Sequence, residues 1–140
     1  MNQDTEDRAH LAAARIYAGE LSRCKRLQVC CLFVKGRNIL ARGINGMPSG
    51  GDNQCEDEHG DSKPEVQHAE DNAILHAAKS GIALEGSTVY LTHAPCLRCA
   101  SKLAALGVVR VVFSEVYRCT KGLDYLKSQD IETCYLASVL

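Results

Sequence analysis

Two short motifs, His68-Ala69-Glu70 and Pro95-Cys96-Leu97-Arg98-Cys99, limit how this chain can fold. Together they supply one imidazole, one carboxylate and two thiols, and the thiols have the CxxC spacing of metal ligands. The segment between the motifs has room for one helix and one strand. We therefore expect a fold that turns back once and brings both motifs to one point.

The residues around the motifs predict alternating helices and strands. The alanine-rich run 68–80 is helical in composition and ends at Gly81. Pro95 suits the first turn of a helix that Gly107 closes. Strands are expected at residues 29–34, 39–43, 88–92, 108–113 and 131–136, and further helices at 9–21, capped by Thr5 or Asp4, and 122–129.

This order predicts an α/β fold in one domain spanning residues 1–140. A hairpin followed by strands alternating with helices favours a three-layer α/β/α arrangement, with helices flanking a mixed five-stranded sheet. Residues 43–64 are rich in glycine and include Pro48 and Pro64. A loop of this length in a compact domain is usually functional or mobile.

Charge and hydropathy argue against some classes of function, although a local basic patch could still form. The net charge is −1, so no broad basic surface for nucleic acid is expected. The acidic amino terminus does not resemble a signal peptide, and no apolar run approaches the roughly 20 residues that span a bilayer. We therefore expect a soluble cytoplasmic protein without a nucleic-acid or membrane partner.

Eight cysteines need an explanation. A disulfide framework is not expected in a reducing cytosol. Adjacent Cys30 and Cys31 should point to opposite faces of a strand, and these two, Cys119 and Cys134 are expected to be small buried apolar residues. The cysteines left as metal-ligand candidates are Cys24, Cys55, Cys96 and Cys99.

The central motifs predict a catalytic zinc site. His68, Cys96 and Cys99 supply the three protein ligands that such a site needs, and the fourth position is left for water. Zinc lowers the pKa of that water to about 7. Glu70 is close enough to accept the proton and return it to a substrate. The pattern H-x-E followed by P-C-x-x-C is typical of zinc-dependent deaminases.

The cysteine motif has two other possible interpretations. A CxxC pair can be a redox pair, but that role favours a position after the first strand and no partner HxE motif. It can also be half of a structural zinc site, but no fourth Cys or His accompanies His68. The combined pattern favours the deaminase site.

Longer stretches of the sequence resemble the deoxycytidylate (dCMP) deaminases. His68-Ala69-Glu70-Asp71-Asn72-Ala73-Ile74 resembles their HAExNAI motif, and Pro95-Cys96-Leu97-Arg98-Cys99-Ala100 resembles their PCxxCA motif. Three other segments resemble the GYNGxPxG loop, the CED-type segment and the ExY motif of that branch: residues 43–50, 55–57 and 115–117. The resemblance covers about residues 24–131, and the short chain is similar to phage and viral members.

The resemblance implies zinc-dependent hydrolytic deamination of dCMP to dUMP and ammonia, which supplies dUMP for dTTP synthesis. By the same resemblance Glu70 is the proton carrier, and Asn45, Ala69 and Tyr117 contact the substrate. Family members are commonly hexamers regulated by dCTP as activator and dTTP as inhibitor. These effectors bind with Mg at the loop that here contains Gly43, Ile44 and Gly46; Ile44 replaces a usual aromatic residue.

The resemblance also implies a second, structural zinc. Cys24, Cys55 and His59 fall at places comparable to ligands of some phage-type members. Glu65 is an alternative fourth ligand, and His93 a weaker one because it lies beside the catalytic cysteines. His93-Ala94-Pro95 also departs from the family pattern, which often has Ser before the proline.

Rival functions remain open at this point. A deaminase of another base, or one acting on both dCMP and dCTP, would use the same zinc chemistry. A zinc-binding nucleotide sensor without catalysis would lack the acidic residue at position 70, and Glu70 is present.

Overall fold

The computed structural model describes residues 2–48, 50–116 and 119–137. Its centre is a mixed five-stranded sheet in the order β2-β1-β3-β4-β5. β1 pairs antiparallel with β2 and β3, whereas β3, β4 and β5 run parallel. The strands are β1 (Cys30–Lys35), β2 (Asn38–Ile44), β3 (Thr88–His93), β4 (Arg110–Glu115) and β5 (Glu132–Tyr135).

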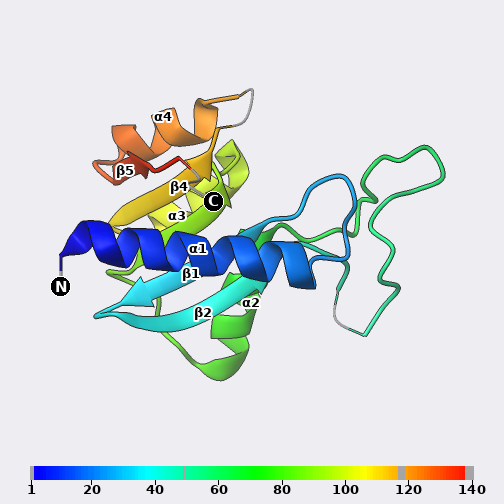
Figure 1. Cartoon of the computed structure of the whole chain (residues 1–140), viewed down its shortest axis with the longest axis horizontal. Coiled ribbons are helices and arrows are strands. Elements are labelled where there is room, and N and C mark those ends of the chain that lie inside the picture. The colour runs from blue at the N-terminus through cyan, green and yellow to red at the C-terminus, as the bar shows by residue number, and fades with distance from the viewer. Residues whose placement is uncertain (1, 49, 117–118, 138–140) are drawn as a thin grey trace.

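Helices cover both faces of the sheet, so the predicted three-layer α/β/α fold is confirmed (Figure 1). α1 (Gln3–Leu21) lies across one face alone. The opposite face carries α2 (Ala69–Ser80), α3 (Leu97–Ala105) and α4 (Lys121–Ser128). Among the described residues, no helix is both long enough and apolar enough to cross a membrane.

The sheet separates two apolar cores. The larger lies under α2, α3 and α4 and includes Cys31, and the smaller lies under α1 and includes Cys30. Both thiols are fully buried. The prediction that these neighbours point to opposite faces is therefore confirmed, as the alternation of side chains in a strand requires.

A buried ion pair fixes α1 to the sheet. Both carboxylate oxygens of Asp7 accept hydrogen bonds from the guanidinium of Arg110 on β4, each at 2.7 Å. The hydroxyl of Tyr90 on β3 donates to the same carboxylate at 2.6 Å. Burial by itself raises the pKa of Asp7, but the hydrogen bonds from Arg110, Tyr90 and Gln3 outweigh it and hold the pKa below its ordinary value.

Two local predictions were wrong. α1 begins at Gln3 rather than residue 9, and its cap is Asn2, whose side chain accepts from the backbone N–H of Thr5. The first turns carry no apolar periodicity, so only their capping chemistry could have revealed them. Cys119 is exposed instead of buried, because it lies in an irregular segment after β4 rather than in a strand.

The segment between β2 and α2 is irregular and projects beyond the sheet (Figure 1). It begins two residues later than predicted, because β2 continues to Ile44. Gly46 and Gln67 form an isolated antiparallel bridge at its base. This bridge closes the segment just before α2, where the first predicted metal ligand lies.

Candidate active site

The three predicted metal ligands lie at the starts of two helices. His68 is the N-cap residue of α2, Cys96 is the N-cap residue of α3, and Cys99 lies in the first turn of α3. The Nδ1 atom of His68 is 3.4 Å from the Cys99 sulfur and 3.7 Å from the Cys96 sulfur. The structure thus brings together all three donor atoms, which lie within 4.8 Å of one another.

This donor set fits zinc. One imidazole and two thiols are a common catalytic zinc set, and both helix amino termini favour thiolates through their partial positive charge. Hydrogen bonds with Cys99 and His68 lower the pKa of Cys96 to about 3. The pKa of Cys99 is raised, first by its hydrogen bond to Cys96 and then by burial. Cys96 is therefore readily available as a thiolate, and a bound dication would favour loss of the proton from Cys99 as well.

Glu70 lies in the first turn of α2, two residues beyond His68. Its side chain is almost completely buried, with 5% exposed, and it lines the same cavity as the three ligands. Burial raises the pKa of this carboxyl to about 7. A carboxyl with this pKa can both accept and release a proton near neutral pH.

The cavity around these residues has a volume of about 1160 Å³, enough for a nucleotide-sized ligand. Four basic side chains line it. Lys63 pairs with Asp52 and Lys102 with Asp71. The other two, Arg26 and Arg98, have no ion pair within the described part of the chain, so they are available to an anionic ligand.

Two of the three predicted substrate contacts line this cavity. Ala69 does so from the start of α2, and Asn45 from the end of the hairpin. The Asn45 side chain also binds the protein: its Oδ1 accepts from Ser22 Oγ and from the Val29 N–H, and its Nδ2 donates to a backbone carbonyl. It thereby holds the segment 22–29 in place. Tyr117, the third predicted contact, lies outside the described residues.

Two of the predicted effector-binding residues have structural roles. Gly43 lies against α2, where a Cβ atom would be 2.0 Å from the carbonyl oxygen of Ala69 and 2.3 Å from the nitrogen of Ala73. Gly46 exchanges two backbone hydrogen bonds with Gln67. Both residues therefore fix how α2 begins.

The sequence interpretation did not assign roles to several residues that shape the site. Asn72 on α2 donates to the carbonyl of Ile44, which is the third predicted effector residue. Gly122 at the start of α4 touches the metal-binding peptide, since a Cβ atom there would be 2.0 Å from the carbonyl oxygen of Pro95. Exposed Cys119 lines the cavity. Of these residues, only Asn72 could have been predicted from the sequence, because it belongs to the segment that resembles the HAExNAI motif.

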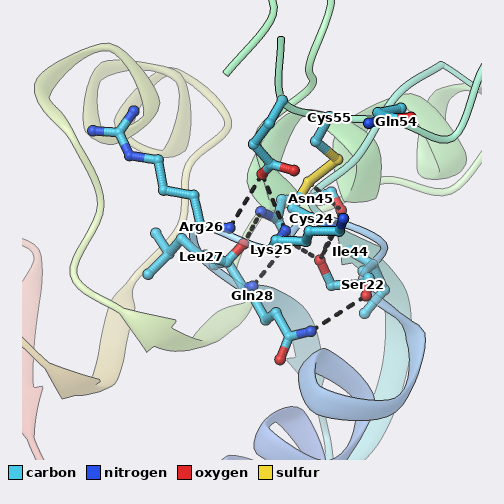
Figure 2. The surroundings of a disulfide bond; sticks show 12 residues. Ser22, Cys24, Lys25, Arg26, Leu27, Gln28, Ile44, Asn45, Gln54 and Cys55 are labelled. Atoms are coloured by element: carbon cyan, nitrogen blue, oxygen red, sulfur yellow. Dashed lines mark hydrogen bonds between the residues drawn. A yellow bond between two sulfur atoms is a disulfide. The ribbon is translucent and has the colours of Figure 1, made fainter. Parts of the chain in front are cut away.

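Cys24 and Cys55 form a disulfide, so the expectation of no disulfide was wrong (Figure 2). The irregular segment returns over the start of the hairpin, which places the two Cα atoms 5.1 Å apart. That proximity depends on the path of the loop and has no local sequence signal. The sulfurs of a disulfide are not the thiolates that zinc requires.

The predicted second zinc set of Cys24, Cys55 and His59 is therefore not formed in this structure. His59 is 75% exposed, and its Nε2 atom faces Glu58. The acidic residue close to the two sulfurs is instead Glu56. Neither suggested fourth ligand, Glu65 or His93, belongs to this group.

His93 lies at the end of β3 and lines the cavity beside Pro95. Its Nε2 atom is 2.7 Å from a carboxylate oxygen of Glu115 on β4, and its Nδ1 atom is 2.9 Å from the hydroxyl of Thr92. Burial lowers the pKa of His93 below its ordinary value, although Glu115 acts in the opposite direction. His93 thus pairs with Glu115 and is not among the residues grouped with Cys24 and Cys55.

Comparisons with known proteins agree with this chemistry. The model of the cytidine and deoxycytidylate deaminase zinc-binding region matches residues 4–115. ComE operon protein 2 of Bacillus subtilis is 35% identical, over 84% of this chain and 60% of that protein. The deoxycytidylate deaminase of Enterobacteria phage T4 is 30% identical, over 79% of this chain and 80% of that protein.

The lengths of these relatives differ. The chain spans 60% of the Bacillus protein and 36% of the Saccharomyces cerevisiae deoxycytidylate deaminase, so it covers under two thirds of both. Among solved structures, the dCMP deaminase of cyanophage S-TIM5 in complex with dCMP and dUMP is 38% identical. The two structures superpose with a TM-score of 0.91, and the match covers 97% of this chain and 99% of the cyanophage chain.

Proposed function

Because this chain belongs to the cytidine and deoxycytidylate deaminase family, we propose that it converts dCMP to dUMP and ammonia by hydrolysis. The observation that carries this proposal is the meeting of His68, Cys96 and Cys99 beside buried Glu70 in one cavity. The likeness to a dCMP deaminase solved with dCMP and dUMP supports this choice of substrate. In this proposal residues 1–140 form one deaminase domain that supplies dUMP for dTTP synthesis in the cytoplasm.

The proposed reaction divides between the metal site and Glu70. Zinc held by His68, Cys96 and Cys99 supplies the Lewis acidity that makes a water molecule nucleophilic at neutral pH. Glu70 takes a proton from the water that attacks C4 of the cytosine ring. It gives this proton to N3. It then takes the second proton from the new C4 hydroxyl group and gives it to the amino group, so that the C4 carbonyl forms, the C4–N bond breaks and ammonia leaves. Burial of Glu70 keeps this exchange away from bulk water.

The ammonia released from a panel of substrates tests the function. Zinc-loaded protein is incubated with cytosine, deoxycytidine, dCMP, dCTP and 5-substituted dCMP, and the rates are compared. We expect dCMP to be turned over with the highest kcat/KM. Equal use of dCTP would favour the bifunctional alternative, and a preference for free cytosine would favour another base. No turnover of any substrate by the zinc-loaded protein would contradict an enzyme and favour the nucleotide sensor.

Arg26 is the side chain that we expect to recognise the 5′-phosphate of dCMP. It lines the cavity and has no ion pair within the described residues. Replacing Arg26 with Ala is expected to raise the KM for dCMP by about tenfold or more, because charge-assisted hydrogen bonds contribute about 1.5–3 kcal/mol. The slower reaction of deoxycytidine, which has no phosphate, should be unchanged. Arg8→Ala is the control, since Arg8 lies exposed on α1 and pairs with Asp4. An equal loss with both substrates would contradict this role.

The same proposal includes the regulation and assembly that the family suggests. We propose that the protein is a homo-hexamer in which dCTP activates and dTTP inhibits, each bound with Mg near Gly43, Ile44 and Gly46. Family membership is what supports this part of the proposal. Rates of dCMP turnover measured with added dCTP or dTTP test it, and a flat response to both would contradict it. A second zinc would require reduction of the disulfide, with Glu56 in place of His59 as third ligand.

A further inference from the structure

A second cavity lies beside the one that contains the metal ligands. It has a volume of about 550 Å³ and lies where β3, β4 and β5 end. Leu27 and His93 line both this cavity and the larger one. The other described residues that line it are Ser114, Glu115, Val116, Tyr135 and Ala137. Leu27 and His93 therefore lie between the two cavities and limit how far a ligand in the larger one can extend.

Both ring nitrogens of His93 have partners within the protein. Nε2 lies 2.7 Å from a carboxylate oxygen of Glu115, and Nδ1 lies 2.9 Å from the hydroxyl of Thr92. That hydroxyl oxygen accepts from the N–H of Cys30 at 3.1 Å, so its own proton can be donated to Nδ1 of His93. Nε2 then carries the ring proton and donates it to Glu115. The ring is thus held in its neutral form, and it presents carbon atoms to a ligand.

The backbone that carries this ring is also fixed. His93 lies opposite Glu115 in the parallel pairing of β3 and β4, and the N–H of Ala94 donates to the carbonyl of Glu115 at 2.8 Å. The hydroxyl of Ser114 donates to the carbonyl of Thr92 at 2.9 Å, and both of these residues are buried. The position of the His93 ring is therefore set before a ligand enters the cavity.

Glu70 and His93 reach the larger cavity from different parts of the sheet. α2, which carries Glu70, packs on β1 and β2. His93 lies at the end of β3, which β1 separates from β2 and which adjoins β4 on its other side. In the proposed reaction Glu70 gives a proton to N3 of the ring, and C4 lies between N3 and C5. The C5 edge of the base is therefore the edge that faces away from Glu70 and toward His93.

We propose that His93 is a specificity-determining residue, whose ring closes the cavity beside C5 of the cytosine and excludes a substituent on that carbon. This inference rests on the proposed function for the identity of the base. The excluded ligands are cytosine nucleotides with a methyl or hydroxymethyl group on C5. The second cavity has room for such a group only when the ring of His93 is absent. Glu115 acts through His93 and is a positioning residue.

Kinetics of the zinc-loaded protein with dCMP and with 5-hydroxymethyl-dCMP test this role. The unaltered protein should favour dCMP in kcat/KM by about tenfold or more, because a pocket discriminates one methylene-sized group by about 10–200-fold. His93→Ala removes the ring and should reduce this preference by about tenfold, mainly through a lower KM for the 5-substituted nucleotide. His93→Leu fills a similar volume and should retain the preference.

Variants of Glu115 leave the ring present and test how it is held. Glu115→Ala should reduce the preference for dCMP by about two- to tenfold, because a hydrogen bond that orients the ring is lost. Glu115→Gln keeps an acceptor oxygen for Nε2 of His93 and should retain the preference. His76→Ala is the matched control and should change neither rate, because His76 is exposed on α2 and is not among the residues that line the cavity.

Three kinetic results would overturn the proposal. The first is equal use of the two nucleotides by the unaltered protein, and the second is an unchanged preference in His93→Ala. The third is an equal fall in kcat/KM for both nucleotides in His93→Ala, since a purely structural loss would not distinguish them. If His93→Ala does not fold, Glu115→Ala decides, and an unchanged preference there would also overturn the proposal.

Binding of the reaction products separates this inference from the proposed reaction. Calorimetry with the zinc-loaded protein compares dUMP with 5-hydroxymethyl-dUMP. The unaltered protein should bind dUMP about tenfold more tightly, and His93→Ala should bind the two with nearly equal affinity. If the protein deaminates no nucleotide but these ratios hold, only the proposed function fails. If it deaminates dCMP but the ratio is the same in both proteins, only the role of His93 fails.

Discussion

Replacing Glu70 with Gln is expected to lower the kcat for dCMP deamination by about 10²–10⁴-fold, the range that a positioned general acid–base contributes. Gln has nearly the same shape and can still accept a hydrogen bond, but its amide cannot take up a proton from water or deliver one to the ring. The loss should therefore fall on kcat, while the KM for dCMP changes little.

Zinc content distinguishes this loss from damage to the metal site. The Glu70→Gln protein should retain one zinc per chain at His68, Cys96 and Cys99, because Glu70 is not one of the grouped ligands. Glu65→Gln is the control, since Glu65 lies only three residues before His68 but is exposed. Substantial remaining activity in Glu70→Gln, or loss of its zinc, would refute the role assigned to Glu70.

Replacing Asp7 with Asn is expected to reduce the free energy of unfolding by about 3 kcal/mol, near the lower end of the range for breaking a buried ion pair. The substitution leaves the guanidinium of Arg110 with Glu132 as its remaining acidic partner at a more exposed position. Denaturant unfolding at pH 7 measures the change. Asp4→Asn breaks an exposed pair with Arg8 on the same helix and should cost less than about 1 kcal/mol.

The effect of Asp7→Asn should depend on pH in one direction. The pKa of Asp7 is lower in the folded protein than the value of about 4 that is usual for an unfolded chain. The contribution of Asp7 to stability is therefore complete above about pH 4 and is lost as the pH falls through the folded-state pKa. The difference between the two proteins should narrow below pH 4. A constant difference down to pH 2 would contradict this account.

The order of elements and the ligand cluster followed from local sequence patterns. The CxxC spacing after Pro95, and His68 at the start of an alanine-rich run, are enough to predict two helix starts that meet. The structure brings those three ligands together. The strands were also found within a few residues, because short apolar runs between glycines have a clear signal.

The features that were missed depend on contacts between distant segments. The Cys24–Cys55 disulfide requires the loop to return over the hairpin, and spacing in the sequence does not encode that path. The expectation of a reducing cytosol, in which disulfides are rare, also argued against this disulfide. The early start of α1 was missed because Asp7 faces the core through an ion pair, which hydrophobic periodicity cannot detect.

The contact of Gly122 with Pro95 has a consequence for the rigidity of the metal site. α4 meets the peptide before Cys96 backbone to backbone, without a side chain between them that could change rotamer and absorb a displacement. A Cβ atom at position 122 would therefore displace the peptide that leads into the metal-binding Cys96. The close approach at Gly122 thus restricts where α4 can pack relative to the metal-binding peptide. Substitutions at Gly122 should be tolerated less well than substitutions at the exposed residues of α4. Designs that alter or truncate the carboxyl-terminal third of the chain should preserve this backbone contact before any surface residue.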